Sequence, residues 1–588
     1  MMKTQAIHPL GTKARILLSS VFGPYAQDDE YGSRKINPME LYQNQVTRVQ
    51  GAYSLRMFHR SFALLMIQTN IDAPCTVLDF PSLNRFTREM KNQSYDIIGI
   101  SSIGPNIEKV RAMCHLIRAY QPTAMVLVGG HIASIENLDK MIDADRIIKG
   151  DGIQWFRKFL GQDLKAPVKH PMTYSAFGAR MMGVTLRDKP GDVAAILIPS
   201  VGCPIGCNFC STSALFGGKG RFINFFETGD EIFNVMCQME RKLKVRSFFI
   251  LDENFLLHRK RALRLLELME EHQKSWALNV FSSARVIKSY TIEQLVSLGI
   301  IWVWMGLEGK DNQYRKLNDI DTRKLVRDMQ SHGIRVLGST IIGLENHTPE
   351  NITDAIEYAV KHETDFHQFM LYTPNPGTPL YEKHKKAGTL FSESEFAMAD
   401  AHGQYRFNYR HPHIDNGMEG QYLINAFTRD FQINGPSLGR LIRTMLKGRQ
   451  RYKNHPDKRI QVRYQLDTAP IQTIYAGAVW AMKKRFWKNK AVHQKLKMLL
   501  KDLYREFGWK TRIIAPFTGI YCLAAIINEE RRLKKGWSYE PKTFYEKNEA
   551  ALSMEQTVAV RKKKALRMNW PVPKPAPEIC ASSKSGSY

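Results

Sequence analysis

Three cysteines lie close together in the segment Cys203-Pro-Ile-Gly-Cys207-Asn-Phe-Cys210. Three thiolates at this CxxxCxxC spacing can bind three irons of a cubane 4Fe–4S cluster, and the fourth iron then keeps a position without a protein ligand. Such an iron can bind a small molecule and take part in its chemistry, whereas a cluster held by four cysteines mostly transfers electrons. We therefore predict a 4Fe–4S cluster with Cys203, Cys207 and Cys210 as its metal ligands.

Other uses of these cysteines fit the sequence less well. A structural zinc site needs a fourth ligand, mostly in paired CxxC or Cys/His motifs, yet the nearest downstream histidine, His258, stands alone. A disulfide scheme leaves one of three cysteines unpaired, and the N-terminus does not resemble a secretory signal. We expect one iron–sulfur centre, no auxiliary cluster and a reducing cytosol, because the other five cysteines are far apart in the sequence: Cys75, Cys114, Cys237, Cys522 and Cys580.

The positive charge of the chain is concentrated near its C-terminus. The 588 residues predict two to four domains, and the hydrophobic content of 44% is ordinary for a soluble globular protein. Residues 431–588 contain 33 Lys and Arg against 11 Asp and Glu, a net charge of +22, whereas residues 1–430 carry +6. Such a surface attracts nucleic acid or an anionic membrane, and it is also compatible with an ordinary solvated helical surface.

Two regions alternate short apolar runs with helical patterns. Residues 12–165 predict a doubly wound parallel sheet, whose ligands would bind at the carboxyl ends of its strands. Residues 190–405 contain six βα repeats, which predict three quarters of a closed barrel with its polar strand ends facing one mouth. The predicted fold class is therefore α/β, with a Rossmann-like domain followed by a partial (β/α)6 barrel.

The cysteine motif, with Phe209 before its last cysteine, resembles the signature of the radical S-adenosylmethionine (radical SAM) superfamily. The resemblance implies that the open iron binds the amino and carboxylate groups of SAM. Reductive cleavage then gives methionine and a 5′-deoxyadenosyl radical, with electrons from a donor such as flavodoxin or ferredoxin. Residues at matching positions of the barrel are implied as contacts of the cluster or of SAM: Phe209, Asn254, Arg285, Glu308 and Gly343.

The first domain resembles the cobalamin-binding domains that precede radical SAM barrels. It lacks the DxHxxG loop that supplies a cobalt ligand in many cobalamin proteins, which is compatible either with base-off binding or with a domain that has lost the cofactor. His131 fits contact with the periphery of the cofactor better than an axial position, and it fits a plain loop residue as well. The implied cofactor contacts are Ser101, Ser102, Gly129, Gly130, His131 and Gly150.

The C-terminal region changes character after residue 418. Residues 418–550 repeat apolar positions at helical spacing with Lys and Arg between them, which predicts a basic α-helical domain, and residues 551–588 read as a disordered tail. An apolar run at residues 513–527 is too short to span a bilayer by itself. It predicts either a core helix or an interfacial anchor.

These resemblances imply a cobalamin-dependent radical SAM enzyme, a C-methyltransferase that acts on an unactivated carbon of a lipid-like or secondary-metabolite substrate. The expected location is cytoplasmic or peripheral at an anionic membrane surface, and nucleic acid is not an expected partner. One alternative is a non-methylating radical SAM cyclase or rearrangement enzyme. Another is a tRNA-modifying methylthiotransferase, but those enzymes carry three further cysteines in the N-terminal domain, where this chain has only Cys75 and Cys114. A non-catalytic sensor is a third, which the intact cysteine motif disfavours.

Overall fold

A parallel sheet forms the N-terminal part of the computed structural model, which describes residues 7–23, 30–31, 40–186, 191–309, 317 and 320–553. Its parallel strands follow the order β3-β1-β4-β5-β6, which is the flavodoxin-like form of a doubly wound sheet. The strands are β1 (Ile16–Ser20), β3 (Cys75–Asp79), β4 (Ile97–Ser101), β5 (Met125–Gly129) and β6 (Arg146–Ile148). The prediction of a doubly wound sheet is confirmed.

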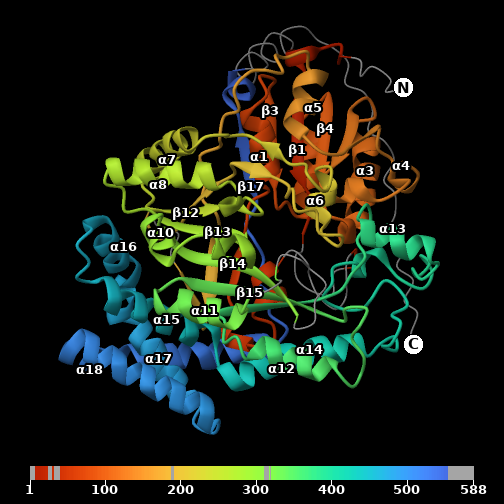
Figure 1. The fold of residues 1–588 in the computed structure, drawn as a ribbon. Coiled ribbons are helices and arrows are strands. Elements are labelled where there is room, and N and C mark those ends of the chain that lie inside the picture. Colours follow the sequence, from red (N-terminus) through yellow and green to blue (C-terminus); the bar gives the residue numbers. More distant parts are fainter. Residues whose placement is uncertain are drawn as a thin grey trace.

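Helices cover both faces of this sheet (Figure 1). One face packs against apolar side chains of α1 and α5, and the other packs against α2, α3 and α4. The strands are buried on both sides, which explains their continuous apolar runs. The helices are α1 (Phe62–Thr69), α2 (Leu83–Asn92), α3 (Ile107–Tyr120), α4 (Leu138–Met141) and α5 (Gly152–Phe159).

The edge of the sheet is completed by a strand from the other end of the chain. Strand β17 (Phe544–Lys547) pairs antiparallel with β3, so that the blue C-terminal segment lies beside the red N-terminal sheet in Figure 1. The prediction of an all-helical region up to residue 550 is therefore wrong for these residues. The alternation in Phe544-Tyr-Glu-Lys547 is too short to stand out, and only pairing with β3 makes it a strand.

A second parallel sheet forms the partial barrel in the order β9-β12-β13-β14-β15-β16. The six predicted strands are thus confirmed, although several begin or end up to six residues from the expected position. Their bounds are β9 (Ala195–Leu197), β12 (Ser247–Ile250), β13 (Ala277–Ser283), β14 (Ile300–Glu308), β15 (Arg335–Ile342) and β16 (Phe366–Leu371).

Amphipathic helices follow the barrel strands and bury their apolar faces against the sheet. They are α6 (Ser211–Leu215), α7 (Gly229–Leu243), α8 (Arg259–Glu271), α9 (Ala284–Lys288), α10 (Ile292–Ser297), α11 (Thr322–Ser331), α12 (Ile352–Val360) and α13 (Pro379–Lys386). Short strands form two further, smaller sheets. One contains β2 (Arg56–Phe58), β7 (Phe177–Met181) and β8 (Val184–Thr185), and the other contains β10 (Ser200–Val201) and β11 (Ile223–Asn224).

The basic C-terminal region is a helical layer at the end of the molecule remote from the N-terminal sheet (Figure 1). It comprises α14 (Glu419–Asn434), α15 (Ser437–Tyr452), α16 (Lys458–Thr468), α17 (Ile474–Arg485) and α18 (Lys490–Lys534). Helix α18 is interrupted at Gly508, whose φ of 77° and ψ of −164° are not helical. The chain therefore turns there, and α17 packs against the residues on both sides of the turn.

Helix α18 differs from the sequence expectation in its length. The apolar run at residues 513–527 belongs to a helical segment of 45 residues, and among the described residues this is the one helix long and apolar enough to cross a membrane by length and composition. Only 28% of its most apolar window is buried. The run therefore lies on the surface with one face packed, unlike the core helix that is one of its two predicted forms. The predicted tail lies outside the described residues except for 551–553.

Candidate functional site

The three cysteines lie in one loop between β10 and α6, and each is half-buried. The backbone of the loop is tight: Cys210 donates its N–H to the carbonyl of Cys207 at 3.0 Å. Gly206 has a φ of 66°, and a Cβ atom there would lie 2.5 Å from the Cα of Lys219. Only glycine fits this close approach, so Gly206, directly before Cys207, allows the tight path of the loop.

The surroundings of the thiols disfavour the charged thiolate form. Burial raises the pKa of Cys203 to about 11 and also raises that of Cys210, and the neighbouring thiols of the loop contribute to both shifts. Bound metal reverses such shifts, because a coordinating thiol is deprotonated.

The donor set of the loop suits an iron–sulfur cluster. Its three half-buried thiols interact electrostatically with one another. Three thiolates can each bind a different iron of a cubane, and the fourth iron then keeps an open position. The loop therefore fits a 4Fe–4S cluster.

A buried carboxyl group next to the loop was missed by sequence reasoning. Glu253 follows β12, accepts a hydrogen bond from the backbone of Gly202, and interacts electrostatically with Cys203 and Cys210. Burial raises its pKa to about 7, and its Oε2 atom has no hydrogen-bond partner among the described residues. The sequence signal for Glu253 is its position in the polar segment after a parallel strand, from which the prediction names Asn254 alone.

Asn254 joins two strands rather than facing open space. Its Oδ1 atom accepts hydrogen bonds from Ser282 Oγ at 2.8 Å and from the backbone N–H of Ser283 at 3.2 Å. Asp252 accepts from the backbone of Asn254 and pairs with Arg261 at 2.6 Å, deep in the barrel. Asn254 thus holds the ends of β12 and β13 together beside Glu253, and a contact with SAM stays a prediction.

The other predicted SAM contacts lie at the carboxyl ends of β13, β14 and β15. Arg285 is exposed in the first turn of α9, two residues after β13 ends. Glu308 ends β14, is buried, and has a φ of 55°, a left-handed conformation that a glutamate adopts only under constraint. Gly343 follows β15 with a φ of 75°, and a Cβ atom there would lie 2.3 Å from the ring of Phe407. Gly343 is therefore required by packing, whatever it contacts besides.

Phe209 anchors the cysteine loop to the far side of the barrel. Its ring packs with Tyr372 at a centroid distance of 6.3 Å and with a small apolar cluster at the ends of β15 and β16. The neighbouring Asn208 accepts a hydrogen bond from the N–H of Leu380 at 3.0 Å. The placement of Phe209 supports a positioning role, and its contact with a cofactor stays a prediction.

The predicted cofactor contacts of the first domain lie along one edge of the sheet, at the carboxyl ends of β4, β5 and β6. Gly130 has a φ of 88°, and a Cβ atom there would lie 2.5 Å from the carbonyl oxygen of Ser102. Gly150 has a φ of 91° and nothing within 4 Å of the corresponding position. Space is therefore open beside Gly150 and filled beside Gly130. The full predicted set at this edge is Ser101, Ser102, Gly129, Gly130, His131 and Gly150.

This edge faces the mouth of the barrel. His131, in the short helix that follows β5, lies 3.2 Å from Thr212 Oγ1 through its Nε2 atom, and Thr212 is two residues beyond Cys210. A Cβ atom on Gly377, in the loop after β16, would lie 3.1 Å from Ser134 of the same short helix. The carboxyl ends of the two sheets thus meet at the cysteine loop, which sequence reasoning did not predict.

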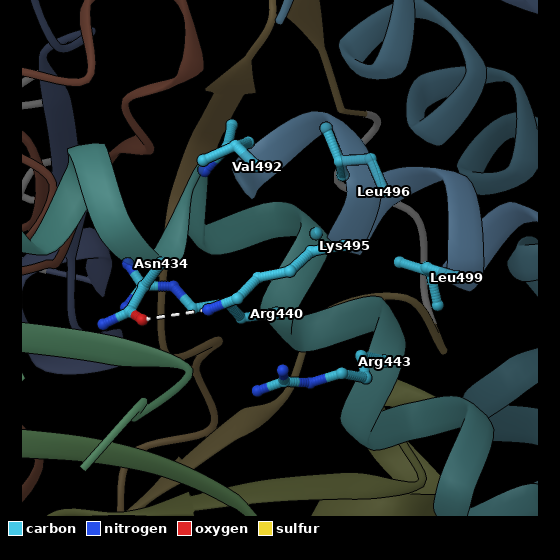
Figure 2. A pocket seen from close by; sticks show the side chains of 9 residues that line it. Asn434, Arg440, Arg443, Val492, Lys495, Leu496 and Leu499 are labelled. Atoms are coloured by element: carbon cyan, nitrogen blue, oxygen red, sulfur yellow. Dashed lines mark hydrogen bonds between the residues drawn. The ribbon is translucent and has the colours of Figure 1, made fainter. Parts of the chain in front are cut away.

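A shallow pocket elsewhere carries no comparable chemistry. Figure 2 shows it between α14, α15 and α18, with Lys495 directed at Asn434 over a distance of 3.3 Å. Two of its cations, Arg443 and Lys495, each pair with Glu363 at 3.1 Å. His411, in the loop before α14, is buried, and its Nε2 atom lies 3.0 Å from the carbonyl oxygen of Leu344. Neither feature adds to the cysteine site.

Residues 197–359 match the radical SAM superfamily. The chain contains a radical SAM domain. Its boundaries enclose the cysteine loop, β12 to β15 and the helices between them, so the match covers the central part of the partial barrel and ends before β16.

Curated relatives resemble more of the chain than this domain. A bacteriochlorophyllide d C-12(1)-methyltransferase of Chlorobaculum tepidum is 25% identical over 311 residues, which span 50% of this chain and 66% of that protein. An anaerobic magnesium-protoporphyrin IX monomethyl ester cyclase of Cereibacter sphaeroides is 20% identical over 365 residues, which span 54% of this chain and 58% of that protein. The chain thus aligns with less than two thirds of the length of each.

Among solved structures, the radical SAM methyltransferase TsrM of Kitasatospora setae, solved with cobalamin and a [4Fe–4S] cluster bound, covers 77% of this chain and 98% of its own at a TM-score of 0.47. The sequence identity is 14%.

Proposed function

We propose that this chain is a cobalamin-dependent radical SAM methyltransferase that methylates an unactivated carbon of a lipid-like or secondary-metabolite substrate. One observation carries the proposal: the carboxyl edge of the Rossmann-like sheet lies directly against the cysteine loop, with His131 and Thr212 in contact at 3.2 Å. A radical-forming centre and a second cofactor site on the sheet would then share one cavity and one substrate.

The cysteine loop supplies the first half of the site. Cys203, Cys207 and Cys210 would hold the cluster, and SAM bound there supplies a strongly oxidising carbon radical when an external donor reduces the cluster. The unpartnered carboxyl oxygen of Glu253 is suited to the ammonium group of an amino acid ligand. Phe209 and Asn254 keep the loop and the strand ends in place through the contacts described above.

The edge of the first sheet supplies the second half. A ligand lying across the strand ends would contact the polar ends of β4 and β5, and no atom within 4 Å of a Cβ position at Gly150 would obstruct it there. Cobalamin held there supplies a methyl group that a carbon radical can take. His131 already contacts Thr212, so we assign it to the rim of this site and not to the cobalt.

Two observations support a lipid-like substrate. One relative methylates bacteriochlorophyllide d, and the C-terminal region combines a high positive charge with exposed apolar side chains. Both favour a substrate that is itself lipid-like. A flavodoxin-type or ferredoxin-type donor would supply the electrons, and an anionic membrane surface would be the source of the substrate.

The test is reconstitution without oxygen followed by incubation with SAM labelled in its methyl group. We expect about four irons and one cobalamin per chain, and transfer of the label to an added lipid-like acceptor together with release of 5′-deoxyadenosine. Visible spectra and cobalt analysis report cofactor binding separately from turnover.

Two outcomes would overturn parts of the proposal. Full iron loading without retained cobalamin would leave the first domain without its assigned ligand. Release of 5′-deoxyadenosine without transfer of label would favour a cyclase or rearrangement reaction, which the similarity to an anaerobic cyclase makes the second candidate.

A further inference from the structure

The outward face of α18 is largely apolar between Trp509 and Ile527. A surface helix normally turns its apolar side chains toward the core and its polar ones toward water. Here large apolar side chains repeat every three or four residues on the exposed side, and Trp509, Phe517 and Tyr521 are 68%, 72% and 65% exposed. We call this set the apolar stripe: Trp509, Ile513, Phe517, Ile520, Tyr521 and Ile527.

The opposite face of the same helix is packed and holds the stripe in place. Gly519 lies against the ring of Trp480, since a Cβ atom there would come within 2.5 Å of it. Glu529 forms a buried ion pair with Arg180 of β7 at 2.5 Å. The side chains of α18 that face α17 and β7 are thus packed against the body of the protein, and the stripe lies on the opposite, exposed side of the helix.

The charged residues within the stripe segment have one sign. No Asp or Glu occurs between residues 507 and 528, while Lys510 and Arg512 lie within this segment. On the helical wheel Arg531 continues the line of the stripe toward its end. The described part of the region, residues 431–553, contains 26 Lys and Arg against 9 Asp and Glu.

We propose that the apolar stripe is a docking surface for an anionic lipid bilayer, on which α18 lies in the plane of the interface. Aromatic and aliphatic side chains would enter the boundary between head groups and acyl chains, and the flanking cations would contact anionic head groups. A second copy of the chain is a poorer occupant, because two surfaces of the same high positive charge repel each other.

The helix lies on the membrane and does not cross it. The stripe from Trp509 to Ile527 is about 27 Å long at 1.5 Å per residue, close to the thickness of a hydrocarbon core. To insert upright, however, the helix would have to break the Arg180–Glu529 pair and expose the packed glycine faces of α17 and α18. A single apolar face combined with a fixed, partly polar opposite face is the pattern of an interfacial helix.

This inference deepens the membrane-surface element of the proposed function, and its test needs neither cofactor nor substrate. Failure of lipid binding and failure of the methyl-transfer reaction are therefore distinguishable.

The test is flotation of the full chain with vesicles of phosphatidylcholine alone or with about a third phosphatidylglycerol. We expect the wild type to float with the anionic vesicles and to be released by high salt. The double variant Phe517→Ser/Ile520→Ser should bind the anionic vesicles at least about tenfold more weakly, because two apolar side chains no longer enter the interface. Lys510→Gln/Arg512→Gln should lose binding mainly at low anionic lipid content.

A matched control is Leu466→Ser on α16, which is 42% exposed but lies outside the stripe and should bind like the wild type. The proposal is overturned if the wild type does not float, or if the stripe variant floats equally well. A third outcome also overturns the proposal: the wild type does not bind lipid, light scattering shows that it is a dimer, and the stripe variant is a monomer. Unchanged circular dichroism and unfolding midpoint of the stripe variant exclude misfolding as the cause of lost binding.

Discussion

The cysteines of the loop after β10 differ from the other described cysteines in their neighbourhood. Each is half-buried and close to the other two thiols, whereas Cys237 on α7 is half-buried by itself. We predict that Cys207→Ala lowers the iron content of the reconstituted protein from about four per chain to nearly none. Cys237→Ala should keep full iron and the visible absorption of the cluster. Retention of iron by Cys207→Ala would remove this loop from the cluster site.

Two glycines at the edge of the N-terminal sheet separate backbone strain from steric contact. Gly130 and Gly150 have nearly equal positive φ angles, but only Gly130 lies against another backbone segment. Gly150→Ala should cost about 1 kcal/mol of unfolding free energy through strain alone. Gly130→Ala should cost about 2–3 kcal/mol, because β4 and β5 must also move apart. Urea unfolding measures both, and equal costs would contradict the contact at Ser102.

Within the helical layer, the attachment of α18 to the body depends on a buried ion pair. Arg180 and Glu529 are both nearly inaccessible, and two hydrogen bonds join them at 2.9 and 2.5 Å. Glu529→Gln leaves a buried guanidinium uncompensated and should cost about 3–5 kcal/mol. The adjacent Glu530→Gln breaks the exposed pair with Arg485 and should cost less than about 1 kcal/mol. Hydrogen exchange should show faster exchange of α18 only in Glu529→Gln.

The whole molecule is joined end to end by β17. Asn548 accepts a hydrogen bond from the N–H of Cys75 at 3.1 Å, and Glu546 pairs with Arg60 at 2.8 Å. A chain ending after Ser553 should keep the unfolding midpoint of the full protein. A chain ending after Pro541 lacks β17 and leaves the β3 edge unpaired, so the N-terminal domain should become sensitive to limited proteolysis. Equal protease resistance of the two truncated chains would mean that β17 contributes little.

Stability should fall in mild acid because several buried histidines stay neutral in the folded protein. Burial lowers the pKa of His170, His362 and His402 to about 4 and that of His367 to about 3. The unfolded chain takes up these protons below about pH 6.5 and the folded chain does not, so unfolding is favoured as pH falls from about 6.5 to 4. Each group contributes about 1.4 kcal/mol per pH unit within that window.

Three buried carboxyl groups act in the opposite sense. Burial raises the pKa of Glu40 and of Glu253 to about 7 and also raises that of Asp365, so the folded chain holds protons there that the unfolded chain releases. The four histidines outnumber these carboxyl groups, and the urea midpoint should be lower at pH 5 than at pH 7. His170→Gln should reduce this difference, because one buried histidine that stays neutral in the folded chain is then removed. Equal midpoints of the wild type at the two pH values would contradict the prediction.

Local patterns in the sequence were enough for the cysteine motif and for both parallel sheets. A CxxxCxxC spacing lies within one loop, and a strand buried on both faces must be continuously apolar, so neither inference needs the tertiary structure. The Rossmann-like and barrel strands were therefore predictable to within a few residues. Asn254, Glu308 and Gly343 were predicted to lie at the carboxyl ends of barrel strands, and they do.

The tertiary structure decided which distant segments meet and which surfaces stay open. Contact between His131 and Thr212, pairing of β17 with β3, and burial of Glu253 all join residues far apart in sequence, and no local periodicity encodes such pairings. The apolar run at residues 513–527 has the same composition whether it is core or surface. Only the packing of its opposite face against α17 and β7 leaves Phe517 and its neighbours facing outward.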